Sequence, residues 1–209
     1  MKIKGNWDLS SRMWLNRQIN DPYVKLARRN GYRSRAAFKL LEMDDKFHLI
    51  KNAKRIIDLG AAPGGWSQAL SQRSSDKAKI LAVDLLPFDS LDKVDQFCMD
   101  FEDEDARRKI MDHMGGRVDL IVSDMAPPAV GHAQTDHARI MRLVESARSF
   151  ALEVLEKGGT FATKIFQGGR EKFLLESMKK EFQKVCFFKP KSSRSLSAEI
   201  YIVAMGLKK

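Results

Sequence analysis

The sequence predicts a doubly wound α/β fold: a Rossmann-like, seven-stranded, mostly parallel sheet with helices on both faces. Short apolar runs typical of buried strands alternate along the chain with segments whose apolar residues recur at helical spacing. A glycine-rich turn at residues 58–66 joins the first of these runs to a helical segment, as in nucleotide-binding βα units. With 209 residues and 44% hydrophobic content, the chain is expected to be a single domain, residues 1–209.

Seven apolar runs are expected to form the strands, and they cover residues 55–57, 79–84, 96–100, 118–124, 160–166, 185–188 and 200–204. Residues 136–156 carry apolar side chains at helical spacing, and Gly158 and Gly159 are expected to end that helix. A further helix is expected over residues 170–182. Residues 1–50 predict a basic, helical N-terminal extension that packs on the core.

The turn at residues 58–66 is the most informative motif in the chain. Ala62 stands where the dinucleotide fingerprint needs its second glycine, and Trp66 stands where a P-loop needs its lysine. What remains is Asp58 at the end of a strand, followed by a turn of small residues that lets the backbone approach a ligand. A carboxylate there repels phosphates but suits the sulfonium and ammonium groups of S-adenosylmethionine. The turn therefore predicts a site for that cofactor.

Acidic residues are expected at the carboxyl ends of four successive strands: Asp58, Asp84, Asp100 and Asp124. In open α/β sheets, ligands bind beyond those ends. Asp84 lies about 20 residues past the glycine turn, the separation at which an acid reaches the ribose hydroxyls. Asp100 is expected to accept from the adenine amine, and Asp124 is expected to face the sulfonium. Together the four acids predict one adenosine-binding site.

The net charge of +10 is concentrated at the two ends of the chain. Residues 1–55 hold 14 Lys and Arg against 5 Asp and Glu, residues 56–188 hold 18 against 21, and residues 189–209 hold 5 against 1. A slightly acidic body with two basic ends is typical of a catalytic core that binds a polyanion such as RNA. Arg33 and Arg35 alternate with small and aromatic residues, so we expect both to bind RNA.

Other sequence features argue against a membrane, a disulfide scaffold or a metal. No apolar run approaches the length of a membrane span, and the N-terminus lacks the apolar stretch of a signal peptide. Cys98 and Cys186 lie in apolar, strand-like settings and are expected to be small core residues of a cytoplasmic protein. His132 and His137 are five residues apart, which is not a metal-binding spacing, and both are expected at the surface.

The acceptor of the methyl group is predicted by exclusion. Residues 123–129 contain prolines without the following aromatic residue that holds a flipped base in amine methyltransferases. Neither cysteine is expected at a carboxyl strand end, where carbon methylation needs a nucleophile. A hydroxyl remains, which in a polyanion means the ribose 2′-OH. Such a poor nucleophile needs a base that charged neighbours hold in place. Lys164 lies inside an apolar strand, where an unpaired lysine would be costly, and Glu199 lies at the start of the last strand. These two residues are the candidates for the base and its charged neighbour.

Four residues, Lys39, Asp124, Lys164 and Glu199, resemble the K-D-K-E tetrad of RNA 2′-O-methyltransferases. Nearly the whole chain is similar to the FtsJ/RrmJ family of 23S ribosomal RNA (uridine-2′-O)-methyltransferases, with matching segments at residues 33–40, 58–68, 84–87, 123–127, 164–168 and 192–204. The resemblance implies the Rossmann-like, S-adenosylmethionine-dependent methyltransferase fold. It also implies a target uridine in the A-loop of the peptidyl-transferase centre of 23S rRNA, methylated late in assembly of the large ribosomal subunit.

The resemblance implies roles for individual residues as well. Carried over by position, the family's cofactor contacts fall on Gly64, Trp66, Asp84, Asp100 and Asp124. The proton acceptor falls on Lys164, with which Lys39, Asp124 and Glu199 form the catalytic set. We expect the enzyme to act as a monomer.

Two other functions compete with this one. A methyltransferase for a small-molecule hydroxyl would use the same core, but it has no need for the basic N-terminal segment. An RNA-binding assembly factor without activity would have no use for a lysine inside a strand.

Overall fold

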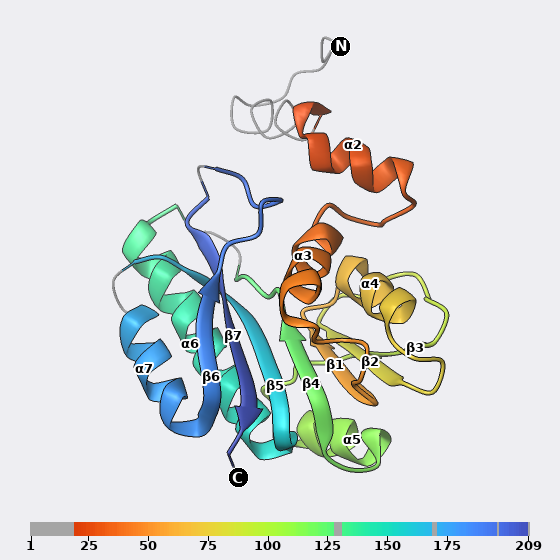
Figure 1. Ribbon diagram of the computed structural model, residues 1–209, viewed down its shortest axis with the longest axis vertical. Coiled ribbons are helices and arrows are strands. Elements are labelled where there is room, and N and C mark those ends of the chain that lie inside the picture. Colours follow the sequence, from red (N-terminus) through yellow and green to blue (C-terminus); the bar gives the residue numbers. More distant parts are fainter. Residues whose placement is uncertain (1–18, 128–130, 169–170, 196, 209) are drawn as a thin grey trace.

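The computed structural model describes residues 19–127, 131–168, 171–195 and 197–208 (Figure 1). Seven strands form one sheet in the order β3-β2-β1-β4-β5-β7-β6. The strands are β1 (Arg55–Leu59), β2 (Lys79–Asp84), β3 (Val94–Cys98), β4 (Val118–Ser123), β5 (Leu155–Phe166), β6 (Phe182–Phe188) and β7 (Glu199–Leu207). This is the predicted doubly wound fold.

Most neighbouring strands are parallel, as the sequence predicts. β3, β2, β1, β4 and β5 run in one direction, and β7 is antiparallel to both β5 and β6. The central strands are buried on both faces, which explains why their sequences are nearly continuous apolar runs. The register of β5 and β7 sets Lys164 opposite Tyr201 and Phe166 opposite Glu199, so the two predicted catalytic strands are neighbours.

Helices cover both faces of the sheet (Figure 1). On one face, α3 (Ala37–Phe47) and α4 (Gly65–Arg73) contribute to a core with the central strands and β7. On the other, α5 (Glu104–Met114), α6 (Ala133–Val154) and α7 (Glu171–Glu181) bury apolar stripes. The order of the strands reverses between β1 and β4, and it is at such a point that open α/β sheets bind ligands.

The predicted N-terminal extension is described from residue 19 onward. Its helix α2 (Pro22–Arg29) begins at the N-cap Asp21, which accepts a hydrogen bond from the backbone N–H of Tyr23. The next helix, α3, buries Leu40 and Met43 completely in the core. Residues 1–18 lie outside the described residues, so the packing of the extension as a whole stays a prediction.

Three expectations differ from the structure. Gly158 and Gly159 do not end the long helix, because α6 stops at Val154 and β5 begins at Leu155. The pairing of β4 with β5 jumps there from Val118–Leu155 to Leu120–Thr160, and Gly158 has a φ of +86°, which suits glycine within such an irregularity. Cys98 is exposed rather than buried, and it is the last residue of β3, so the expectation that no cysteine lies at a carboxyl strand end was wrong. No helix in the described part of the chain is long and apolar enough to cross a bilayer.

Candidate active site

A pocket of about 470 Å³ lies beyond the carboxyl ends of β1, β2, β3 and β4. Its volume is within the range of small-molecule and cofactor sites. Its lining includes three of the four predicted acids, together with apolar side chains: Asp84, Asp100, Asp124, Leu86, Met99 and Met125. The structure therefore brings together the residues that the sequence analysis assigned to ribose, adenine and sulfonium.

The carboxylate of Asp84 is held by the turn that it faces. One oxygen accepts from the backbone N–H of Ala62 at 2.9 Å, and the other accepts from that of Leu86 at 2.8 Å. Asp100 is fixed in a similar way, because its Oδ1 accepts from the backbone N–H of Glu102 at 2.9 Å. Each carboxylate oxygen has lone pairs for a further donor. Both acids are thus oriented before any ligand arrives.

The glycine turn approaches the pocket closely at one residue. Gly60 lines the pocket and has a φ of +73°, and a Cβ atom there would lie 2.3 Å from Cγ of Met125. Gly64 and Trp66 do not line the pocket. Trp66 is buried, and its Nε1 donates to the carbonyl of Ala36 at 2.8 Å. Trp66 thus contacts the N-terminal extension, and the centre of the Tyr201 ring lies 5.7 Å from that of Trp66. That Gly64 and Trp66 contact the cofactor stays a prediction.

Asp58 lies beneath the turn and not in the pocket. Its side chain is completely buried, Oδ2 accepts from the Ser67 hydroxyl at 2.6 Å, and Oδ1 has no partner among the described residues. Burial, with smaller contributions from the nearby charges of Asp124 and Asp84, raises the pKa of Asp58 to about 7. A cationic ligand in the pocket above would favour the charged form, so the donor set fits S-adenosylmethionine.

A buried acid with a raised pKa should make stability fall with rising pH. In the unfolded state the pKa of Asp58 is near 4, so the native state binds the proton more tightly. The stability that this proton contributes is lost as pH rises toward 7. Holding the ionised group in the native state costs roughly 4 kcal/mol at most. Urea unfolding of the parent protein and of Asp58→Asn should show that the variant gains stability relative to the parent between pH 5 and pH 8. A difference that stays constant with pH would contradict this.

The four tetrad residues form two ion pairs. Lys39 Nζ lies 2.8 Å from Glu199 Oε1, and Lys164 Nζ lies 3.1 Å from Asp124 Oδ1. Lys164 also donates to the backbone carbonyl of Asp124. Both lysines are more than 90% buried, a costly arrangement that the two carboxylates make possible. Asp124 also lines the pocket at the strand ends, so it joins that pocket to the lysine.

Tyr201 connects the two ion pairs, a position that was not predicted from the sequence. Its hydroxyl donates to Asp124 Oδ1 at 2.6 Å, and Lys39 Nζ lies 5.9 Å from the centre of its ring. Burial and the charges of Asp124 and Glu199 raise the pKa of Tyr201 well above its usual value, so the group stays a donor. The two-residue repeat of a β-strand could have indicated this position. Tyr201 lies two residues after Glu199 and therefore on the same face of the strand.

Arg33 and Arg35 are both engaged within the protein. Arg33 donates to the carbonyls of Asp89 and Ser90 at 2.6 and 2.7 Å. Arg35 pairs with Asp21 at 2.6 Å and donates to the carbonyl of Ser192. These contacts tie the extension to the loops beside the active site. That either arginine binds RNA stays a prediction.

Comparisons with known proteins agree with this geometry. The model of the FtsJ-like methyltransferase family matches residues 32–207. "Ribosomal RNA large subunit methyltransferase E" of Granulibacter bethesdensis is 52% identical over 208 residues, which cover 100% of this chain and 90% of that protein. The protein of the same name from Rhizobium etli is 50% identical over 202 residues, with 95% and 84% covered.

One solved structure is similar in both sequence and fold. It is described as a ribosomal RNA methyltransferase of Plasmodium falciparum, with 32% sequence identity and a TM-score of 0.77. The similarity covers 84% of this chain and 98% of that chain. The predicted fold class and family resemblance are thereby confirmed: the chain belongs to the FtsJ-like methyltransferase family.

Proposed function

We propose that this methyltransferase uses S-adenosylmethionine to methylate the 2′-hydroxyl of a uridine in 23S rRNA. The observation that carries the proposal is the position of Asp124, which lines the cofactor pocket and pairs with the buried Lys164. Methyl donor and proton acceptor would meet at this one carboxylate. The names of the relatives support large-subunit ribosomal RNA as the substrate. We propose further, from the family resemblance, that the uridine lies in the A-loop and is methylated late in subunit assembly.

The tetrad provides for deprotonation of the hydroxyl. Lys164 would accept the 2′-proton, which it can do only as the neutral amine. Asp124 holds the lysine in position through its carboxylate and its backbone carbonyl. Tyr201 donates to the same carboxylate and fixes its orientation. Lys39, paired with Glu199, adds a positive charge near the place where negative charge develops on the oxygen.

The cofactor pocket provides the binding contacts. S-adenosylmethionine, when bound, supplies an electrophilic methyl group. Asp84 would accept from the ribose hydroxyls and Asp100 from the adenine amine, both with carboxylates already oriented by backbone N–H groups. The buried Asp58 would add negative potential beneath the turn.

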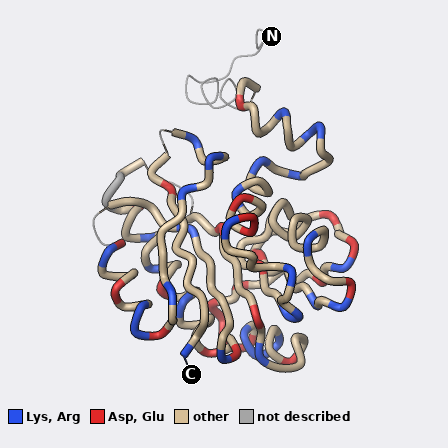
Figure 2. The backbone as a smooth tube through the Cα atoms, in the orientation of Figure 1, with Lys and Arg blue, Asp and Glu red and all other residues tan. Residues whose placement is uncertain are grey.

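Basic residues gather at the end of the molecule where the N-terminal extension lies. Figure 2 shows Lys and Arg along α2 and on the loop between β6 and β7. Lys25, Arg28 and Arg29 on α2 are exposed, as is Lys191 on the loop. This surface would contact the phosphates that flank the target nucleotide.

RNA binding by this surface should depend strongly on salt. With five to eight phosphate contacts, affinity should fall by about 10²- to 10⁴-fold between low and moderately high salt. The double variant Arg28→Gln with Arg29→Gln removes two positive charges. It should make the slope of log affinity against log salt concentration shallower by about 1 to 2. The matched control is Arg108→Gln with Lys109→Gln on α5, exposed residues far from α2 (Figure 1). Equal slopes for the two double variants would remove α2 from the RNA interface.

A transfer assay tests the proposed function. Tritium from labelled S-adenosylmethionine should enter unmethylated large ribosomal subunits and not small subunits or a panel of low-molecular-weight hydroxyl compounds. Label in the small molecules alone would favour the small-molecule methyltransferase. Binding of subunits without any transfer would favour the inactive assembly factor.

A further inference from the structure

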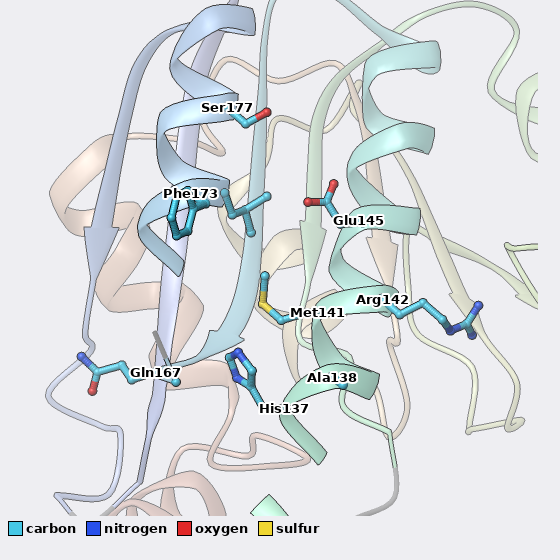
Figure 3. A pocket seen from close by; sticks show the side chains of 10 residues that line it. His137, Ala138, Met141, Arg142, Glu145, Gln167, Phe173 and Ser177 are labelled. Atoms are coloured by element: carbon cyan, nitrogen blue, oxygen red, sulfur yellow. The ribbon is translucent and has the colours of Figure 1, made fainter. Parts of the chain in front are cut away.

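The larger of the two cavities described here is not the cofactor pocket. It is a cleft of about 1140 Å³ between α6 and α7, above the usual upper limit of about 1,000 Å³ for small-molecule sites. Side chains of Ser177, Glu145, Met141 and His137 point into it, and Phe173 lies on α7 at its side (Figure 3). An open cleft of this size suits a segment of a polymer better than a metabolite.

The contacts of Arg148 tie the two helices together at one end of the cleft. This guanidinium donates to Glu145 on its own helix at 2.9 Å and to Ser177 and Glu181 on α7 at 2.7 and 2.6 Å. Both helices run from the carboxyl edge of the sheet toward its amino edge, so the cleft opens at the carboxyl edge, where His137 and Gly168 lie. Lys164 acts at the same edge, and Gln167 follows it by three residues, about 10 Å of strand.

Two features at the open end are costly unless something binds there. Phe173 is 79% exposed, more than any other large hydrophobic side chain among the described residues. His137 holds both ring nitrogens out of solvent, and neither has a partner in the described part of the chain. The ring rests on Gly168, where a Cβ atom would lie 2.5 Å from Nδ1, so the glycine is needed for this placement. His137, which the sequence predicted at the surface, is half-buried, whereas His132 is exposed as predicted.

The charges of the cleft are paired, which favours a neutral group over a phosphate as its occupant. Its one cation, Arg142, lies 2.9 Å from Glu102. Its lining offers Met141, Phe173 and Leu174 as apolar surface, and its one acid, Glu145, is neutralised by Arg148. Unpaired bases of RNA are neutral, stack on aromatic side chains and form hydrogen bonds along their edges. Phe173 supplies a ring for stacking, and the exposed Gln167 supplies an amide donor and acceptor.

We propose that the α6–α7 cleft binds an unpaired base of the RNA substrate, one or two nucleotides from the methylated one, stacked on Phe173. The inference rests on the proposed function, because it requires the target hydroxyl to lie at Lys164. It makes Phe173 and Gln167 determinants of substrate choice. Basic α2 would hold the backbone on one side of the target, and the cleft would hold a base on the other.

The test compares variants of Phe173 on unmethylated large ribosomal subunits. Phe173→Ala and Phe173→Leu should raise the KM for subunits, and the Kd from filter binding, by about 5- to 150-fold, the range measured for loss of one stacked base. Phe173→Trp should stay within about twofold of the parent, because its ring also stacks. The KM for S-adenosylmethionine should not change. Phe187→Ala, at another exposed phenylalanine on β6, is the matched control.

A photo-cross-linker, p-benzoylphenylalanine at position 173, identifies the occupant directly. It should label 23S rRNA within two nucleotides of the methylated uridine. A Phe173→Ala variant that matches Phe187→Ala in KM and Kd, or a cross-link to a ribosomal protein, would overturn the inference while leaving the methylation itself intact. If the parent binds subunits but transfers no methyl group, the proposed function fails, and the filter-binding Kd still decides whether the cleft binds RNA.

Discussion

Replacing Lys164 with alanine should reduce single-turnover methyl transfer by at least about 10³-fold, near the upper part of the range for loss of a general base. The reason is that the amine lies 3.1 Å from Asp124, which lines the pocket at the strand ends, and the residues that line this pocket include no lysine or histidine. Lys164→Arg keeps the charge but cannot accept a proton at any working pH, so it should be as inactive as alanine. Rates would be measured by rapid quench with saturating enzyme and labelled cofactor.

The control for this experiment is Lys157→Ala, an exposed lysine on the same strand β5, which should keep the parent rate. Cofactor and subunit affinities should be unchanged in all three variants, which separates chemistry from binding. A substantial rate in Lys164→Arg would mean that the lysine only orients the hydroxyl. The proton would then leave to water or to Asp124, and the general-base role would have to be abandoned.

Asp84→Ala should weaken S-adenosylmethionine binding by roughly 10- to 150-fold, which corresponds to about 1.5–3 kcal/mol for hydrogen bonds to a charged group. The carboxylate is held by the N–H groups of Ala62 and Leu86, so its removal deletes the acceptor and also releases the turn. RNA affinity should hardly change, since Asp84 lines the proposed cofactor pocket.

Isothermal calorimetry of the parent, Asp84→Ala and Asp84→Asn would measure this effect. The asparagine keeps one oxygen acceptor and should lose less affinity than the alanine. Asp92→Ala, an exposed acid beyond the same strand, is the matched control and should bind as the parent does. Cofactor affinity within error of the parent for Asp84→Ala would mean that the acids at these strand ends do not form the adenosine site.

Most of the fold could be predicted because parallel strands buried on both faces leave a strong signal. The apolar runs of β1, β2 and β4 are nearly continuous, and each was placed to within about two residues. The start of β5 was missed, because Gly158 and Gly159 look like a helix stop and the irregular β4–β5 pairing that uses them is a tertiary feature. The burial of Cys98 was predicted wrongly because β3 is an edge strand of the sheet, and Cys98 is exposed there.

Which candidate residues lie close together could largely be predicted, but how deeply each side chain is buried could not. The strand-end rule correctly brought Asp84, Asp100 and Asp124 to one pocket. The rule could not predict that Asp58 lies beneath the turn. Asp58 is the residue before the last residue of β1, and its side chain is completely buried. Tyr201 was missed because tyrosine in a strand is ordinary, and its hydrogen bond to Asp124 depends on the pairing of β5 with β7.

The position of the transferred methyl group tests the central claim most directly. Large ribosomal subunits methylated by this protein would be digested to nucleosides and analysed by mass spectrometry, with a second sample hydrolysed in alkali. We predict one new 2′-O-methyluridine per subunit, within a dinucleotide that alkali cannot cleave because the 2′-oxygen is blocked. A methyl group on a base, or on a ribose other than that of uridine, would contradict the account.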